Sequence, residues 1–351
     1  MMSGNGNALR VGLAGCGPRA VGHAQALAAS TACRLAACAD IDADRGAEFG
    51  RRFAVPHVYP SVAAMLHDHP VDLLVVATPA AVRRPVVDDV LTAGTPPRGI
   101  LVEKPIAVRA EEGYRILDDC REAGVALFGN HQLRYFPPLR RFRDEIASGT
   151  IGRIRLIRAA TKWSILEHGS HLLDLVGFLF GDTLVADRVL AQAVGWADDG
   201  RLPPAPHHTA GIAIFHEGPR LYFECGRDAP TWPGSTNPWH QAGIELIGTD
   251  GTAGWSLNRG WWCAGSAGTR EERYQHETHD DPAQAALFDS IAVALGDPAA
   301  TAAHPAGAVR AAWSFQIIMA ALRAAAAGTW VEAAQPVADH NLKALPERAV
   351  A

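Results

Sequence analysis

Residues 9–20 read Leu9-Arg-Val-Gly-Leu-Ala-Gly-Cys-Gly-Pro-Arg-Ala20, a short apolar run that leads into a glycine-rich turn. The turn has the pattern G-x-G-x-x-A and lies between a predicted strand and a predicted helix. Small residues permit a tight turn and let the backbone approach a pyrophosphate, and the start of the helix offers N–H groups to the anion. The stretch therefore predicts a strand–turn–helix unit that binds a dinucleotide. The predicted binding residues of the turn are Gly15, Cys16, Gly17, Pro18 and Arg19.

The alternation of short apolar runs and longer helical patterns continues as far as residue 128. Such an alternation is typical of βαβ units and a parallel sheet, so an α/β domain is predicted over residues 8–128. The predicted strands are Leu9–Ala14, Leu35–Ala39, Asp72–Ala77, Gly99–Val102 and Val125–Phe128, and the predicted helices are Arg19–Ala29, Ala43–Phe53, Ser61–Leu66, Ala80–Ala93 and Ala110–Ala123.

The remaining chain differs in composition, because all nine tryptophans follow residue 129. Its apolar segments are spaced like the strands of a meander, so a second domain with a largely antiparallel sheet is predicted over residues 129–333. Two helical stretches, Pro282–Leu295 and Ala306–Ala327, precede a predicted loosely held tail over residues 334–351. The predicted strands are Arg153–Ala160, Leu184–Val194, Thr209–His216, Arg220–Cys225 and Ile244–Gly248.

Length and composition exclude several classes of protein. The 351 residues, 48% hydrophobic and 20% charged, are typical of two globular domains. A formal charge of −5 without a dense basic run argues against nucleic acid or an anionic membrane as partner. No apolar stretch is long enough to span a membrane, the start of the chain lacks the pattern of a signal peptide, and no C-x-x-C pair occurs. A cytoplasmic protein without a metal or disulfide framework is predicted.

Asp40 follows the second predicted strand directly, about 25 residues after Gly15 and near the roughly 20 expected for a dinucleotide site. A carboxylate at this position accepts hydrogen bonds from an adenosine ribose and repels a 2′-phosphate. Asp40 therefore favours NAD over NADP. The alternative is a glycine turn in a βαβ fold that binds another ligand.

Two further polar segments, Thr78-Pro79 and Glu103-Lys104-Pro105, follow predicted strands at the edge where open parallel sheets bind ligands. Lysine is rare here, since only Lys104, Lys162 and Lys343 accompany 29 arginines among the 32 basic residues. An ammonium group at a strand end can donate to a substrate hydroxyl and stabilise negative charge on its oxygen. Lys104 is therefore a candidate catalytic residue, and a surface lysine that caps the strand is the alternative.

In the second domain, Glu167, His171 and Asp174 share one face if a helix begins at Glu167. A carboxylate one turn before a histidine can orient the imidazole ring and raise its basicity, so His171 is a candidate general base. Two alternatives stay open. His171 is then either a buried structural histidine or, with Glu167 and His168, a metal ligand.

Taken in order, these segments resemble the Gfo/Idh/MocA oxidoreductases, the family of glucose-fructose oxidoreductase and inositol dehydrogenase. The resemblance runs from about residue 8 to residue 333. It implies a Rossmann domain with a doubly wound parallel sheet and a C-terminal α/β domain whose large open sheet forms a homodimer or homotetramer interface. The segments are Gly15–Ala20, Asp40, Thr78-Pro79, Glu103-Lys104-Pro105, Gln132-Leu-Arg134-Tyr135 and Glu167-x-x-x-His171-x-x-Asp174.

The resemblance also implies NAD-dependent oxidation or reduction of a sugar, a cyclitol or a related polyol. Lys104 would polarise the reacting C–O group, and His171, next to Glu167, would exchange its proton. The other implied contacts are Thr78, Pro79, Glu103, Gln132 and again Lys104 toward the cofactor and Arg134, Trp163 and Asp174 toward the substrate.

Two positions depart from the family pattern. Glu167 replaces the usual aspartate, and Thr78-Pro-Ala-Ala-Val-Arg83 replaces T-P-N-x-x-H. Two other functions are compatible with the same motifs. One is a redox-neutral glycosidase or lyase that uses tightly held NAD for transient oxidation, and the other is a ligand-sensing regulator without catalysis.

Overall fold

The computed structural model describes residues 8–196, 204–233, 237–266, 268–274 and 280–333. These residues form two compact units. The first comprises residues 8–107, 112–135 and 280–311, and the second comprises the described residues of 108–111, 136–274 and 312–333. The predicted tail, residues 334–351, lies outside the described residues.

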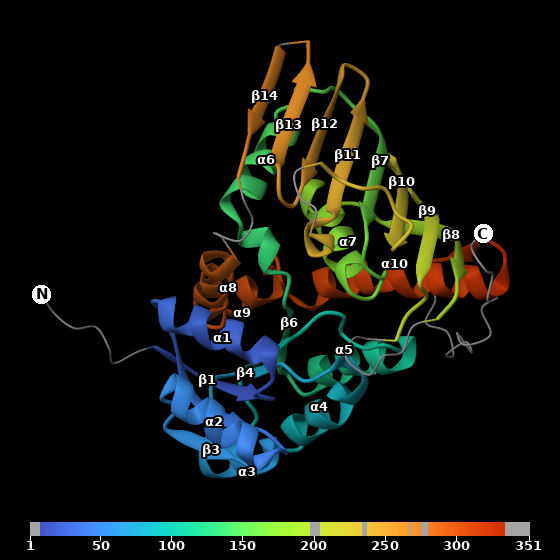
Figure 1. Cartoon of the computed structure of the whole chain (residues 1–351). Coiled ribbons are helices and arrows are strands. Elements are labelled where there is room, and N and C mark those ends of the chain that lie inside the picture. Colours follow the sequence, from blue (N-terminus) through green and yellow to red (C-terminus); the bar gives the residue numbers. More distant parts are fainter. Residues whose placement is uncertain (1–7, 197–203, 234–236, 267, 275–279, 334–351) are drawn as a thin grey trace, which may run out of the picture. The chain divides into compact units, whose positions relative to one another are not determined.

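The first unit is built on a six-stranded parallel sheet with the order β3-β2-β1-β4-β5-β6 (Figure 1). This is the doubly wound dinucleotide-binding order, so the predicted fold class is confirmed for this unit. The strand that the pattern did not predict, β3, has three residues and no apolar run. The strands are β1 (Leu9–Ala14), β2 (Cys33–Ala39), β3 (His57–Tyr59), β4 (Leu73–Val76), β5 (Gly99–Val102) and β6 (Ala126–Gly129).

Helices of the first unit begin and end close to the predicted residues, with one exception. The predicted helix Ala80–Ala93 is a 3-10 turn, η1 (Ala80–Val82), followed by α4 (Arg83–Leu91). The first turn of α4 accommodates Pro85, because the backbone N–H that proline lacks would have no partner within the helix there. The remaining helical elements of the first unit, of which η2 and α9 were not predicted, are α1 (Pro18–Ala29), α2 (Ala43–Phe53), α3 (Val62–Asp68), α5 (Ala110–Glu122), η2 (Gln132–Tyr135), α8 (Asp280–Ala294) and α9 (Pro298–Ala302).

Helix α8 belongs to the first unit although its sequence lies beyond the predicted boundary at residue 128. Asp289 accepts hydrogen bonds from the backbone N–H groups of Thr31 and Ala32 at 3.0 Å each and from the hydroxyl of Ser30 at 2.5 Å. His23 on α1 also meets Phe288 edge to face, with the ring centroids 5.8 Å apart. These contacts attach α8 to the connection between α1 and β2.

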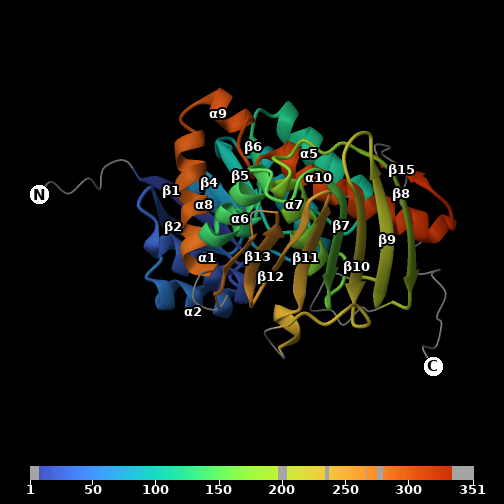
Figure 2. The same cartoon turned by 90° about the horizontal axis from the view of Figure 1, so that it is seen from above.

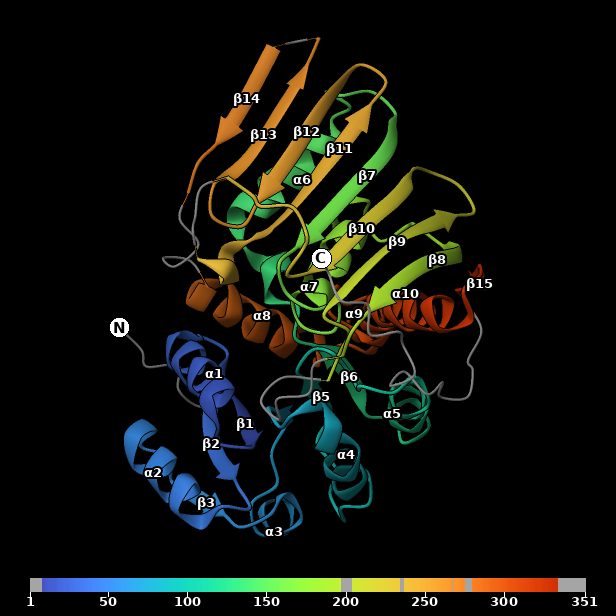
Figure 3. The same cartoon turned by 45° about the vertical axis from the view of Figure 1, so that its right-hand side comes forward.

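The second unit contains a nine-stranded sheet with the order β14-β13-β12-β11-β7-β10-β9-β8-β15 (Figure 3). All its pairs are antiparallel except β7 with β10, which confirms the predicted, mostly antiparallel sheet. The strands are β7 (Ile154–Thr161), β8 (Ala186–Val194), β9 (His208–Phe215), β10 (Arg220–Gly226), β11 (Ala242–Gly248), β12 (Gly251–Ser256), β13 (Gly260–Gly265), β14 (Gly268–Glu272) and β15 (Val331–Glu332).

Strands β12 to β14 escaped prediction because glycines occur in the short apolar runs of β12 and β13 and because β14 has no apolar run. Gly254 pairs with Trp262 on the neighbouring strand, and a Cβ at Gly254 would lie 2.1 Å from the Trp262 ring. The glycine therefore makes room for a tryptophan across the strand pair, whereas a turn is the commoner meaning of such glycines.

One face of this sheet is covered by helices. Figure 2 shows α6 (Pro137–Ala147), α7 (His168–Leu179) and the second-unit part of α10 (Ala308–Ala327) on the same side of the strands. Phe223 and Cys225 of β10 are buried on this side, where Gly169 of α7 lies against the sulfur of Cys225. None of the helices in the described ranges is long and apolar enough to cross a membrane.

His304 in the first unit is a buried imidazole whose neighbours define its protonation. Its Nδ1 accepts the backbone N–H of Ala306 at 3.1 Å, and its Nε2 lies 2.9 Å from the hydroxyl of Ser290. Burial lowers the pKa of His304 to about 4, against a hydrogen bond with Ser290 that raises it. The ring is therefore neutral in the folded protein at pH 5 to 7.

We expect His304 to make the protein acid-sensitive. Between pH 6.5 and 4 the unfolded chain binds a proton at this residue and the folded chain does not, so the free energy of unfolding falls as pH falls. The loss amounts to about 3 kcal/mol across the window. Urea unfolding of the wild type and His304→Gln at pH 7.5, 6 and 5 measures the difference in slope. Parallel slopes would contradict the assignment.

Candidate functional site

The two glycines of the first turn have different reasons to be glycine. Gly15 has φ +89°, and a Cβ there would lie 3.2 Å from Thr78 Cγ2, so the fold itself requires it. Gly17 has an ordinary φ of −75°, and none of the described atoms outside its neighbours lies within 4 Å of a Cβ placed there. Gly17 is also the N-cap of α1, which has no side-chain cap within the described chain. The turn thus leaves an open, uncapped helix start of the kind that binds phosphate.

We expect Gly17→Ala to separate folding from cofactor binding. The methyl group meets open space in the protein, and the change of N-cap residue costs under about 1 kcal/mol of stability. It would occupy the space that a pyrophosphate needs, so NAD affinity should fall at least about tenfold. Thermal unfolding and calorimetric NAD titration measure the two effects. Gly22→Ala, within α1 and outside the turn, is the matched control and should bind NAD normally.

Asp40 is tied to the turn and to the start of α2. Its carboxylate accepts the N–H groups of Cys16 at 2.7 Å and Asp42 at 2.9 Å, and it pairs with the Arg45 guanidinium at 2.6 and 2.9 Å. Burial raises the pKa of Asp40, but the hydrogen bonds from Arg45, Asp42 and Cys16 together lower it below its ordinary value. Asp40 is therefore an ionised carboxylate held next to the glycine turn.

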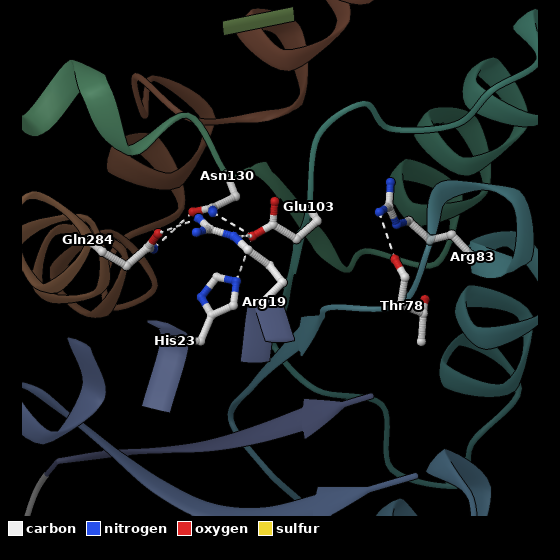
Figure 4. Close-up of polar contacts among 7 residues, drawn as sticks. All are labelled: Arg19, His23, Thr78, Arg83, Glu103, Asn130 and Gln284. Carbon is white, nitrogen blue, oxygen red and sulfur yellow. Dashed lines mark hydrogen bonds and ion pairs between the residues drawn. The ribbon is translucent and has the colours of Figure 1, made fainter. Parts of the chain in front are cut away.

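Glu103 at the end of β5 is the centre of a buried polar network (Figure 4). Its Oε1 accepts from Arg19 Nε at 2.5 Å, His23 Nε2 at 2.7 Å and Asn130 Nδ2 at 2.8 Å. Gln284 of α8 accepts from Arg19 at 3.3 Å and donates to Asn130 at 2.9 Å. Burial raises the pKa of Glu103, but the charges of Arg19, His23 and Lys104 with the His23 hydrogen bond hold it well below its ordinary range.

The network joins two of the residues predicted at the cofactor. Arg19 and Glu103 form an ion pair with each other, and their role toward a cofactor stays a prediction. The pattern did not predict His23, Asn130 or Gln284, because nothing marks a histidine inside a helix or an amide 265 residues from Arg19 as its partner. The ionised Glu103 fixes the end of β5, and Lys104 is the next residue.

Arg83 joins the two loops that follow β4 and β5, although its side chain is 1% exposed. Its guanidinium donates to the backbone oxygen of Thr78 at 2.9 Å (Figure 4). It also donates to the backbone oxygens of Ile106, at 2.9 Å, and Pro105. Burial lowers the pKa of Arg83 to about 10, opposed by the charge of Glu103. The departure from the family pattern at this position is therefore an arginine that holds the Lys104 loop. Thr78 Oγ1, beside it, is buried without a partner among the described residues.

In the second unit, α7 begins at His168, one residue later than predicted. Glu167 is its N-cap residue, with φ −86° and ψ −97°, and its side chain does not cap the helix. The N–H of Glu167 donates to the backbone oxygen of Ser164 in a turn that ends where the helix begins. Glu167 therefore lies before the helix face that carries His171 and Asp174. Asp174 is buried and His171 is half-buried. Within the described ranges no three His, Cys, Asp or Glu side chains gather as a metal site requires.

A chain of aromatic rings leads to His171. Trp163 and Trp239 are stacked with centroids 3.6 Å apart and planes at 19°. His168 lies 5.6 Å from Trp163, 5.1 Å from Trp239 and 6.5 Å from His171, measured between ring centroids. The pattern predicted Trp163 and did not predict Trp239, which belongs to the loop after β10. The other predicted residues, Gln132 and Arg134, lie buried on η2 in the first unit.

The chain is similar to known oxidoreductases. Residues 9–131 match the family described as "Oxidoreductase family, NAD-binding Rossmann fold". Trans-1,2-dihydrobenzene-1,2-diol dehydrogenase of Mus musculus is 29% identical over 164 residues, which cover 42% of this chain and about half, 48%, of that protein. The 1,5-anhydro-D-fructose reductase of Ensifer adhaerens is 26% identical over 83% of this chain and 88% of its own.

Solved structures extend the likeness to both units. An oxidoreductase from Agrobacterium radiobacter, in complex with NAD+, L-tartaric acid and magnesium, superposes with a TM-score of 0.78. The match covers 93% of this chain and 98% of the other, at 19% identity. At this identity the likeness concerns the fold, and it agrees with the two sheets described above.

Proposed function

Because the chain belongs to the Gfo/Idh/MocA family of oxidoreductases, we propose that it transfers a hydride between NAD and a carbinol carbon of a small polyol. The substrate class is a sugar, a cyclitol or a related compound. Relatives named for a dihydrobenzene diol and an anhydrofructose support this class.

One arrangement carries the proposal: three polar loops follow the ends of neighbouring parallel strands in the first unit. They are the open turn at Gly17 after β1, Thr78 after β4 and the Glu103-Lys104 segment after β5. Open parallel sheets bind nucleotides at this edge. The space at Gly17, the uncapped start of α1 and the unpartnered Thr78 hydroxyl all fit a dinucleotide.

We propose NAD rather than NADP as the cofactor. Asp40 is ionised and buried next to the turn, where a carboxylate binds ribose hydroxyls and repels a 2′-phosphate. Its pairing with Arg45 positions the carboxylate for this role. When bound, NAD would supply the hydride acceptor in the oxidation direction.

Lys104 and His171 have complementary roles in the proposed reaction. During oxidation the substrate loses a hydride from carbon and a proton from oxygen. The Lys104 ammonium donates to that oxygen and stabilises its developing negative charge, and His171 accepts the proton. In reduction, the proton returns from His171 to the oxygen. Glu167 and Asp174 would position His171 and the substrate.

The test is the appearance of reduced nicotinamide absorbance with a panel of aldoses, inositols, glycosides and amino sugars, with NAD and NADP in parallel. Reduction of NAD by one substrate class, with at least about tenfold preference over NADP, is the expected result. If the protein binds NADH but reduces no NAD with any substrate, the proposal of net oxidation is overturned. Assays for released leaving groups then examine redox-neutral chemistry.

We also propose that the open face of the nine-stranded sheet binds a second copy of this chain. Tyr222 and Glu224 alternate with the helix-side residues of β10 and therefore point to this face. They line a cavity of about 1010 Å³ together with the Arg158–Glu245 ion pair and Trp262. A broad, partly apolar sheet face is typical of an interface. Sedimentation equilibrium should give a dimer or tetramer, and a monomer at micromolar concentration would refute this.

A further inference from the structure

We propose that Trp239, stacked on Trp163, is an aromatic subsite that takes the C–H face of a cyclic polyol beside His171. The inference rests on the proposed function, since it names the substrate class that the oxidoreductase would accept. It also makes Trp239 a residue that determines specificity, while the acid–base chemistry stays with other residues.

The loop that carries Trp239 is fastened to the sheet at both ends. Lys162 Nζ donates to the backbone oxygen of Arg227 at 3.0 Å, and the Lys162 N–H donates to that of Gln241 at 2.9 Å. Trp232, in the same loop, is buried and donates its indole N–H to Ala160 at 3.0 Å. Trp239 lies on the short 3-10 helix η3 (Pro238–His240), two residues before the anchored Gln241.

The side chain of Trp239 has the solvent exposure of a binding residue and not that of a core residue. Trp232 and Trp255 are 9% and 1% exposed, whereas Trp239 is 43% exposed although it stacks on Trp163. A stacked indole that remains this exposed offers a flat apolar surface to a ligand at little cost in side-chain entropy.

His168 connects this surface with the candidate general base. His168 touches both tryptophans and is followed, one helical turn later, by His171 at 6.5 Å between centroids. A ring of six atoms laid against the indoles can therefore keep its hydroxyl groups free on the rim, where an acid–base group would meet one of them. An open-chain polyol has no such flat face, so the subsite favours cyclic substrates.

The experiment compares Trp239→Ala and Trp239→Phe with Trp330→Ala. Trp330 is a matched control, because it is 40% exposed and packs on Arg188 of β8, near the β15 edge of the sheet. The probes are myo-inositol, 1,5-anhydroglucitol and methyl α-glucopyranoside as rings and glucitol as the open chain. Steady-state kinetics give KM and kcat, and saturation-transfer NMR with NADH present gives ring binding without turnover.

We expect Trp239→Ala to raise KM for the ring that is turned over about tenfold, with kcat and NADH affinity within about twofold. Trp239→Phe should keep most of the affinity, and Trp330→Ala should match the wild type. Equal losses for rings and glucitol, a wild-type KM in Trp239→Ala, or a changed oligomeric state as the sole effect would each overturn the subsite.

The two proposals fail in different ways. Ring binding that depends on Trp239, without reduction of NAD, supports the subsite and counts against the oxidoreductase. Turnover of rings that is indifferent to Trp239 supports the oxidoreductase and overturns the subsite. Absence of both ring binding and turnover with all four probes counts against both.

Discussion

Lys104→Ala is expected to lower kcat at least about a hundredfold while NADH binds with near wild-type affinity. Removal of one donor that stabilises an oxyanion costs roughly 10²–10³ in rate. Cofactor affinity should survive, because the open turn at Gly17, Asp40 and the Arg83 contacts to Thr78 do not involve the Lys104 ammonium. Stopped-flow single-turnover rates and NADH fluorescence titration separate the two quantities.

Two companion variants make the Lys104 result specific. Lys104→Arg keeps the positive charge but replaces a compact ammonium by a planar group, and should recover little activity. Arg121→Ala removes a well-exposed cation on α5 and should leave both quantities unchanged. Wild-type turnover in Lys104→Ala would show that this lysine only caps the end of β5.

His171→Asn should lower kcat by about 10²–10⁴, the range that a positioned acid–base group contributes. The pH profile distinguishes a lost base from a damaged pocket. In the wild type, oxidation should slow as pH falls, because the imidazole must be neutral to accept the hydroxyl proton. In His171→Asn the oxidation rate should lose this decline at low pH and should increase only with the hydroxide concentration.

The control for His171→Asn is His216→Asn, a change at an exposed histidine of the same unit. It should keep the wild-type pH profile. Binding of NADH to His171→Asn should also stay normal, since the glycine turn and Asp40 lie in the first unit. An unchanged acidic limb in His171→Asn would assign the proton transfer to another group.

Five of the six strands of the first sheet were predictable, because they are short apolar runs with a glycine turn or a polar residue next to them, and β3 was not. β1 and β5 have the predicted bounds. The second sheet was predictable only where apolar residues dominate, as in β7 and β10. Strands β12 and β13 depend on packing between strands, because Gly254 of β12 makes room for the ring of Trp262 on β13. The residue pattern of one strand carries no information about the strand beside it.

The candidate site shows the same division between local and long-range signals. Asp40 and the glycine turn are local, and their hydrogen bond follows from the adjacency of β1 and β2. Arg83 was noticeable in the sequence because it replaces the histidine of the family pattern. Its partners are backbone oxygens, which only the folded chain brings near it. The sequence could not distinguish Trp239 from Trp232, because the two tryptophans lie in the same loop and differ in how exposed their side chains are.

The placement of α8 in the first unit bears on how the chain folds during synthesis. Ser30, Thr31, Arg19 and Asn130 all find partners on α8, at Asp289 and Gln284. Residues 8–135 therefore emerge from the ribosome with polar groups that lack these α8 partners until residue 289 has been made. At 5–20 residues per second the delay is roughly 8–31 s. Through that interval the nascent nucleotide domain would be an incomplete structure, the form that chaperones and proteases recognise.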